Sequence, residues 1–278
     1  MKKFYNPTLL AFLLLHVSVY AGNDITTPGA RAVGLANAVV TLSDGWSIHN
    51  NQAGLGFLKN TSAGAYYENR FLISELALSG GYFAMPTKFG VFGLSARSFG
   101  YQLYRESKVG VAYAKTFGPN LSIGIQLNWE QVMLGDIYGN RNGLTAEIGA
   151  QYKFNDKFKL GAHIYNPTRT SLAEFNNERL PTILRFGISY QLNKKILMLG
   201  EVEKNIYAQE SFKGAIEYEL VSVLFLRVGV SNNPLRNTAG FGIKLKKLQI
   251  DFAASFTQNF GFTPHFGLTY QFTSEKEN

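Results

Sequence analysis

The residues best suited to catalysis in this sequence are two histidines and a serine. His163 and His265 fall on the polar side of alternating segments, and Ser255 lies in the segment just before that of His265. A serine beside a histidine forms a nucleophile and its base, but spacing alone does not bring these side chains together. No cluster has the spacing of a metal site, and the chain has 0 Cys, which excludes thiol catalysis. We therefore expect no catalytic residues, no metal and no cofactor.

Charged residues follow the polar sides of the same segments. Both signs occur in similar numbers, which favours ion pairs between neighbouring strands around a shared interior. The net charge is +8, so an exported chain would also be attracted to anionic outer-membrane lipid and lipopolysaccharide, whereas no basic cluster indicates nucleic acid. The polar residues expected to line the interior include Glu130, Glu147, Arg185, Glu201, Glu217, Arg227, Asp251 and His265.

The N-terminal residues have the pattern of an export signal. Lys2 and Lys3 precede an apolar run, and Val19 and Ala21 have the spacing of a signal-peptidase site. The run is shorter than the roughly 20 residues of a spanning helix, which argues against a membrane anchor. Later segments are too polar for such helices, with a mean hydropathy of −0.05 for the chain. We expect residues 1–21 to be a cleaved signal, and any membrane embedding to use strands.

From Ser62 onward, successive segments alternate apolar and polar side chains and end at turn-forming residues. In "LSIGIQLNWE", for example, Ile125 and Leu127 fall on one face, whereas Gln126 and Asn128 fall on the other. This alternation is typical of strands with one apolar and one polar side. The expected strands are 62–69, 74–84, 88–98, 106–117, 120–133, 142–154, 157–166, 182–191, 195–204, 211–220, 223–231, 238–246, 248–257 and 263–272.

The connections between these strands alternate in length. Those after even-numbered strands are tight, and most of the others are longer, the longest running from about Pro167 to Pro181. Short turns at one end and longer loops at the other are typical of bacterial outer-membrane barrels. A soluble β-sandwich gives no reason for this asymmetry, and barrel closure removes the strand edges that lipid does not tolerate. We predict an all-β fold, a transmembrane antiparallel β-barrel of about 14 strands over residues 61–273, with a polar tail at 274–278.

The stretch "SDGWSIHNNQAGLGFL", Ser43 to Leu58, has neither helical nor strand periodicity. Irregular backbone at membrane depth is stable only inside protein or beside water. Trp46 and Phe57 argue against a disordered leader, because disordered segments are poor in large apolar residues. We therefore predict that residues 22–60 form a hatch inside the barrel, with Trp46 or Phe57 wedging it in place.

The longer stretch "GARAVGLANAVVTLSDGWSIHNNQAGLGFL" resembles the N-terminal segment of PorV/PorQ-type proteins, members of the FadL-like superfamily of outer-membrane barrels. Those families carry an Asn-Pro-Ala-Gly-Leu motif in an N-terminal hatch. Gln52 replaces the proline here. The resemblance implies that the motif lies within the lumen, and the matching residues are Asn51, Gln52, Ala53, Gly54 and Leu55, preceded by Asn50.

Two functions follow from this resemblance. PorV/PorQ-type proteins are associated with type IX secretion, which implies a non-enzymatic structural or carrier partner of secretion-system or secreted proteins. The fatty-acid-transporter branch implies instead a gated transporter of a hydrophobic small molecule. The outer loops are short for either role. We take the secretion partner as the main interpretation and the transporter as the alternative, both in the bacterial outer membrane.

Overall fold

The computed structural model describes residues 27–135, 139–171, 180–258 and 261–272. Within them, fourteen strands form one closed barrel in which each strand pairs with its neighbours in the sequence, and β1 pairs with β14. The strands are β1 (Ser62–Asn69), β2 (Ala77–Thr87), β3 (Gly90–Gly100), β4 (Tyr104–Phe117), β5 (Leu121–Leu134), β6 (Gly139–Lys153), β7 (Phe158–Tyr165), β8 (Ile183–Asn193), β9 (Ile196–Asn205), β10 (Ser211–Val221), β11 (Leu224–Ser231), β12 (Arg236–Lys244), β13 (Leu248–Thr257) and β14 (Gly261–Gln271).

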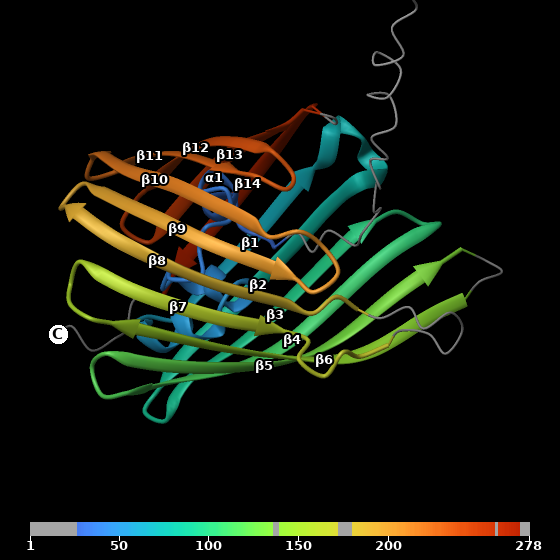
Figure 1. The fold of residues 1–278 in the computed structure, drawn as a ribbon, viewed down its shortest axis with the longest axis horizontal. Helices are drawn as coiled ribbons and strands as arrows, with labels where there is room; N and C mark the ends of the chain where they lie inside the picture. Colours follow the sequence, from blue (N-terminus) through green and yellow to red (C-terminus); the bar gives the residue numbers. More distant parts are fainter. Residues whose placement is uncertain (1–26, 136–138, 172–179, 259–260, 273–278) are drawn as a thin grey trace, which may run out of the picture.

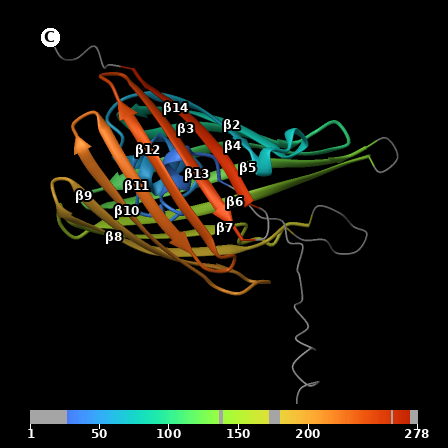
Figure 2. The same cartoon turned by 90° about the horizontal axis from the view of Figure 1, so that it is seen from above.

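All pairings are antiparallel, and the predicted fold class is confirmed. Figures 1 and 2 show the tilted strands enclosing the N-terminal residues, drawn in blue. Short helices precede β1: α1 (Ala30–Gly34), η2 (Gly45–His49) and η3 (Gln52–Phe57). Two further 3-10 turns, η4 (Arg70–Leu72) and η5 (Ser74–Leu76), connect β1 to β2. In the described part of the chain, no helix has the length and apolar character to cross a bilayer.

The alternation of side chains separates a lipid-facing surface from an interior. On β5, Ile125 is 49% exposed and Leu127 is 69% exposed, whereas Gln126 and Asn128 are each 1% exposed. Apolar groups on the outside and polar groups on the inside are the reverse of a water-soluble barrel and suit a wall surrounded by hydrocarbon. The interior of the barrel therefore holds the polar side chains.

The prediction for the second strand was wrong at both ends. It placed the strand at 74–84, whereas β2 runs from Ala77 to Thr87. At the start, Phe71 and Leu72 adopt positive φ values of 56° and 61°, and the turns η4 and η5 follow the end of β1. At the end, Pro86 pairs with Val91 within the ladder, so the tight turn lies after it, at Lys88 and Phe89.

The ends of the barrel differ as the sequence predicts. The turns at 88–89, 118–120, 154–157, 194–195, 222–223 and 245–247 form the short-turn end. The longest connection at the other end joins Tyr165 to Ile183, and residues 172–179 of it lie outside the described part. Short turns face the periplasm in outer-membrane barrels. The predicted signal at 1–21 and the tail at 274–278 also lie outside the described residues.

A charged residue on the outer wall tests the membrane orientation. Leu127→Arg, at the middle of β5, should lower the free energy of unfolding by about 2–4 kcal/mol in lipid vesicles, because the guanidinium would enter hydrocarbon. The control is Leu103→Arg, since Leu103 is also exposed but lies in a loop between β3 and β4. Urea titration of both variants measures the difference, and equal costs would contradict a lipid-facing position for Leu127.

Candidate functional site: the filled lumen

Residues 27–58, called the plug segment below, lie inside the barrel. Helix α1 contacts β11 to β14, and η3 contacts β3 to β6 (Figure 1). Of the predicted hatch motif, Asn51, Gln52, Ala53 and Leu55 are each 0% exposed, and Asn50 is 4% exposed. Residues 22–26 of the predicted hatch lie outside the described part. An irregular segment so deeply enclosed must satisfy its backbone groups by contacts within the protein.

Asn51 joins the plug segment to the wall and to itself. Its Oδ1 accepts a hydrogen bond from the backbone N–H of Ala53 at 3.2 Å, which caps η3. Its Nδ2 lies 2.7 Å from the carbonyl oxygen of Val40 and 3.2 Å from that of Ala150 in β6. Gly149 leaves room for this amide, because a Cβ there would lie 1.9 Å from Asn51 Oδ1. A side chain at Gly149 and the motif asparagine are therefore mutually exclusive in this packing.

Gln52 stands where the motif to which this stretch was compared has proline. It is the first residue of η3, a position where the ring of proline fits without loss of a helical hydrogen bond. Its Nε2 donates to the carbonyl of Ile48 at 3.0 Å and to Glu147 Oε2 in β6 at 2.8 Å. The substitution thus keeps the turn and adds a contact with a buried carboxylate of the wall.

Glu147 forms polar contacts with residues of several strands. His163 Nε2 lies 2.9 Å from Glu147 Oε2, and Asn128 Nδ2 donates to Glu147 Oε1 at 2.9 Å. The ammonium of Lys108 also binds this carboxylate. Because Glu147 is 2% exposed, these donors replace the water that an ionised carboxylate would otherwise require.

Arg31 attaches α1 to the opposite part of the wall. Its guanidinium donates to both carboxylate oxygens of Glu217 in β10, at 2.9 and 2.6 Å, and to Asp44 at 2.8 Å. Arg227 in β11 donates to Glu217 at 2.6 Å and to Asp251 in β13 at 2.6 Å. A paired arginine and carboxylate with two parallel bonds is a strong, directional contact. A chain of ion pairs thus links the plug segment to residues of three strands, β10, β11 and β13.

The backbone between α1 and η2 is held by the wall as well. Gln151 in β6 donates to the carbonyls of Val40 and Leu42, at 2.9 and 2.8 Å. The backbone N–H of Val40 donates to Glu201 Oε2 in β9 at 2.9 Å. These bonds satisfy backbone groups that neither helix nor sheet would satisfy at this depth.

An apolar seam forms the contact between the plug segment and β1 to β4. Ile48 and Leu55 are 0% exposed, and Trp46 is 5% exposed. Trp46 also donates from its indole N–H to Thr269 Oγ1 at 2.9 Å. The prediction names Phe57 as the alternative wedge to Trp46. Phe57 is only half-buried, and the ammonium of Lys153 lies over its ring, 3.5 Å from the ring centre. The remaining seam residues in the wall include Tyr66, Leu78, Tyr82, Ala84, Val91, Ala112 and Ala114.

The other predicted inward residues also lie in buried polar contacts. Glu130 accepts from the hydroxyl of Tyr165 at 2.6 Å. Arg185 donates to Glu203 at 2.7 Å, and Lys213 donates to Glu201 at 3.0 Å. The interior thus consists of paired charges rather than of one open polar passage at the level of these residues.

The structure brings Ser255 and His265 together. Ser255 Oγ lies 3.0 Å from His265 Nε2, and the hydroxyl of Tyr66 lies 2.7 Å from His265 Nδ1 and 2.8 Å from Glu68 Oε2. Ser255 is 7% exposed and His265 is 3% exposed. A nucleophile must be open to its substrate, so this burial favours a structural relay across β1, β13 and β14. Among the described residues, no group of His, Asp and Glu is arranged to hold a metal ion.

Sequence reasoning missed Arg31 and Gln151 as contacts of the plug segment. Arg31 is the only Lys or Arg between Gly22 and Leu58, and this isolation was a usable signal. Gln151 resembles any other polar residue on an inward face, and nothing in its spacing indicates that it binds two carbonyls.

No protein-family model matches the chain, and no curated protein matches it. Solved structures do match. The toluene transporter TbuX of Ralstonia pickettii has a TM-score of 0.72 at 12% identity, covering 90% of this chain and 100% of its own. The CymD monoaromatic hydrocarbon channel has a TM-score of 0.71 at 12% identity, covering 91% and 100%. A Pseudomonas aeruginosa FadL homologue has a TM-score of 0.62 at 13% identity, covering 89% and 99%.

The chain has the fold of a FadL-like outer-membrane barrel. At these identities the likeness concerns the fold alone, and it agrees with the superfamily to which the N-terminal stretch was compared. None of these comparisons tests the narrower PorV/PorQ-type resemblance or type IX secretion, which stay predictions.

Gly149 offers a test of how the plug segment is held in the FadL-like barrel. Gly149→Ala should displace Asn51 and weaken the folded state by about 1–3 kcal/mol, because overpacking and lost buried hydrogen bonds both cost free energy. Gly214→Ala is the control, since a Cβ at Gly214 in β10 meets nothing within 4 Å. Thermal unfolding in detergent measures both. Equal stability of the two variants would show that Asn51 does not need this space.

Removal of the plug segment should widen the passage. About eight strands is the size that wall side chains fill unaided, so a larger barrel lacking residues 22–59 should conduct more in planar bilayers. Ser122→Cys, whose native hydroxyl donates to the carbonyl of Ala53 at 2.7 Å, should then react with a water-soluble thiol reagent. Ser74→Cys is the control, because Ser74 is exposed with or without the plug segment. Unchanged conductance and labelling in the folded deletion protein would contradict occlusion.

Proposed function

We propose that this protein is a gated outer-membrane channel for hydrophobic small molecules and that the plug segment is its gate. This is the alternative interpretation of the sequence rather than the main one. TbuX is a toluene transporter, and CymD is a monoaromatic hydrocarbon channel. Fold likeness alone does not carry function to another chain, so the proposal rests on the contact between the plug segment and the wall.

The observation that carries the proposal is the division of that contact into two kinds. Toward β6 to β13, the plug segment is held by ion pairs and amide hydrogen bonds from Arg31, Asn51 and Gln52, together with a smaller apolar cluster around Leu35. Toward β1 to β4, it is held by the apolar seam. Breaking a buried ion pair leaves unpaired charge at high cost, whereas an apolar molecule replaces apolar contacts without unpaired polar groups.

The seam is therefore the part of the contact that an apolar ligand opens at lowest cost. Gly93 in β3 leaves room for Ile48 and Leu55: a Cβ there would lie 2.7 Å from Ile48 and 3.3 Å from Leu55. The fit is tight, and under this proposal it corresponds to a closed channel. Entry of a hydrophobic molecule would require movement of the Ile48 and Leu55 side chains away from β3, while the contacts of Arg31 and Gln52 keep the plug segment attached.

Two matched truncations test this division. Leu55→Ala should raise the uptake of a labelled aromatic hydrocarbon into proteoliposomes several-fold, because it removes packing on the seam. Leu35→Ala is the control: Leu35 is also 0% exposed in the plug segment, but it packs in a separate apolar cluster with Val39, Leu199 and Ala215. Each truncation should cost about 2–5 kcal/mol of stability, so stability alone does not separate them.

The expected result is increased uptake for Leu55→Ala and wild-type uptake for Leu35→Ala. Equal uptake in both variants would contradict the seam as the gate. If neither variant nor the plug-deleted barrel passes the hydrocarbon, the transport proposal fails, and the predicted role as a carrier in protein export becomes the better interpretation.

A further inference from the structure

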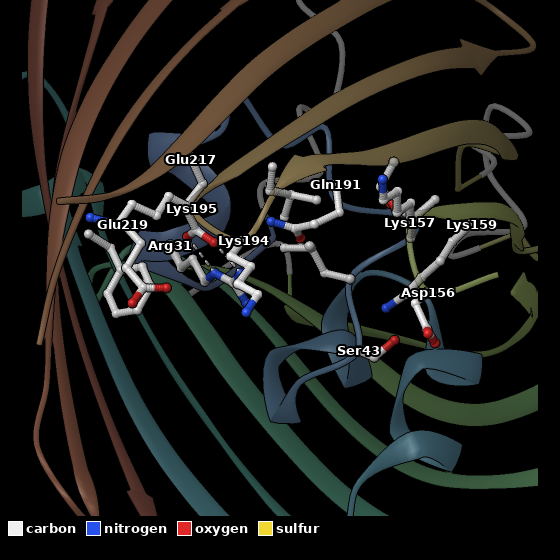
Figure 3. A pocket seen from close by; sticks show the side chains of 15 residues that line it. Arg31, Ser43, Asp156, Lys157, Lys159, Gln191, Lys194, Lys195, Glu217 and Glu219 are labelled. Atoms are coloured by element: carbon white, nitrogen blue, oxygen red, sulfur yellow. Dashed lines mark hydrogen bonds and ion pairs between the residues drawn. The ribbon is translucent and has the colours of Figure 1, made fainter. Parts of the chain in front are cut away.

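A recess of about 430 Å³ lies beside the plug segment at the short-turn end of the barrel. It is bounded by Thr41 to Ser43 of the plug segment and by residues of the turns at 154–157 and 194–195, as Figure 3 shows. Its position is separate from the apolar seam, which lies toward β1 to β4. In outer-membrane barrels this end faces the periplasm.

Four ammonium groups line the recess: Lys157, Lys159, Lys194 and Lys195. Within the described residues, none of them forms an ion pair with a carboxylate. Like charges from neighbouring turns repel one another, and the repulsion is stronger where the protein excludes water. Lys159, on the inward side of β7, is shielded from solvent more than the three turn lysines (Figure 3).

The acidic residues of the recess do not balance these lysines. Glu217 is shared between Arg31 and Arg227, at 2.6 Å from each, so its charge is already compensated. Arg31 is likewise engaged with Glu217 and Asp44. The remaining lining carboxylates are Asp156 and Glu219, which leaves four ammonium groups against two carboxylates. The recess therefore has an excess of positive charge that an anion would neutralise.

The second observation is the hydroxyl of Thr41. Thr41 is 1% exposed and lines the recess, and its Oγ1 has no hydrogen-bond partner among the described residues. A buried hydroxyl without a partner costs free energy, so such groups usually have a partner in the functional state of a protein. The Thr41 hydroxyl is covered in the structure, and a rotation of its side chain toward the recess would offer an oxyanion a donor in addition to the ammonium groups.

We propose that this recess binds the phosphate group of a small molecule on the periplasmic side of the barrel. A phosphate carries close to two negative charges at neutral pH and three acceptor oxygens, which match the charge excess and the free hydroxyl better than one carboxylate does. Lysine is an established point-charge partner of phosphate. The volume lies in the range of small-molecule pockets. The site does not depend on transport of hydrophobic molecules through the seam.

Calorimetric titration of the full chain in a phosphate-free, non-ionic detergent tests the proposal. Inorganic phosphate and glycerol phosphate are titrated separately at constant ionic strength, with chloride as the reference anion. Saturable binding of both indicates that free phosphate suffices, and binding of glycerol phosphate alone indicates a phosphorylated metabolite. Either result supports the site. Binding of neither overturns it, and capture of a polyglutamate peptide by the recess in that case would indicate an acidic protein segment instead.

Variants locate the binding. Lys159→Gln should weaken phosphate binding by about tenfold or more, since a charge-assisted hydrogen bond is lost. Thr41→Val, which removes only the hydroxyl, should weaken it several-fold. The control Lys246→Gln/Lys247→Gln removes two charges from another short turn, between β12 and β13, and should bind as the wild type does. Equal weakening of phosphate binding in the control would show that binding depends only on the overall charge of the protein, and it would overturn the site.

A measurement on the unmodified chain avoids dependence on the folding of the variants. Lysines are acetylated with and without phosphate, and the extent at each position is read by mass spectrometry. Phosphate should protect Lys159 several-fold while leaving Lys246 and Lys247 unchanged. Equal reactivity of Lys159 in both conditions would contradict occupation of the recess.

Discussion

The structure depends on one constraint: irregular backbone enclosed by a membrane barrel must find hydrogen-bond partners in protein. Two side-chain amides contribute to this, Asn51 of the plug segment and Gln151 of the wall. Asn51 reaches outward to a carbonyl of β6, whereas Gln151 of β6 reaches inward to the carbonyls of Val40 and Leu42. The charged contacts of Arg31 and the apolar contacts of Leu55 add to these hydrogen bonds in holding the plug segment.

Much of the barrel follows from the sequence because a wall between lipid and a polar interior repeats the same two-residue period. The alternation at Ile125, Gln126 and Leu127 is enough to assign faces without knowledge of the partners. The start of β2 could not be placed, since the turns η4 and η5 are set by local backbone at Phe71 and Leu72 and not by periodicity. The predicted strand bounds leave Pro86 in the turn after the second strand. In the structure it pairs with Val91 in the ladder, a place that proline can take where its missing N–H is not required.

The interior is less predictable because its contacts join residues far apart in the sequence. The composition of the inward faces predicted paired charges. Arg227 does form ion pairs with Glu217 and Asp251. The further ion pair of Glu217 with Arg31 depends on the path of the plug segment. The same holds for Ser255 and His265, which adjacent strands bring to 3.0 Å. Phe57 shows the converse, since an apolar residue in the plug segment need not lie in its apolar contact.

The chain order of the barrel has a consequence for its assembly. The plug segment leads through Lys59 and Asn60 directly into β1, and β1 closes the wall by pairing with β14, from Ser62 with Gln271 to Glu68 with His265. The plug segment thus precedes every strand of the wall in the chain, and the pairing of the first strand with the last closes the wall. A wall that closes by this pairing can enclose a plug segment that precedes it in the chain, without threading that segment through a finished cylinder.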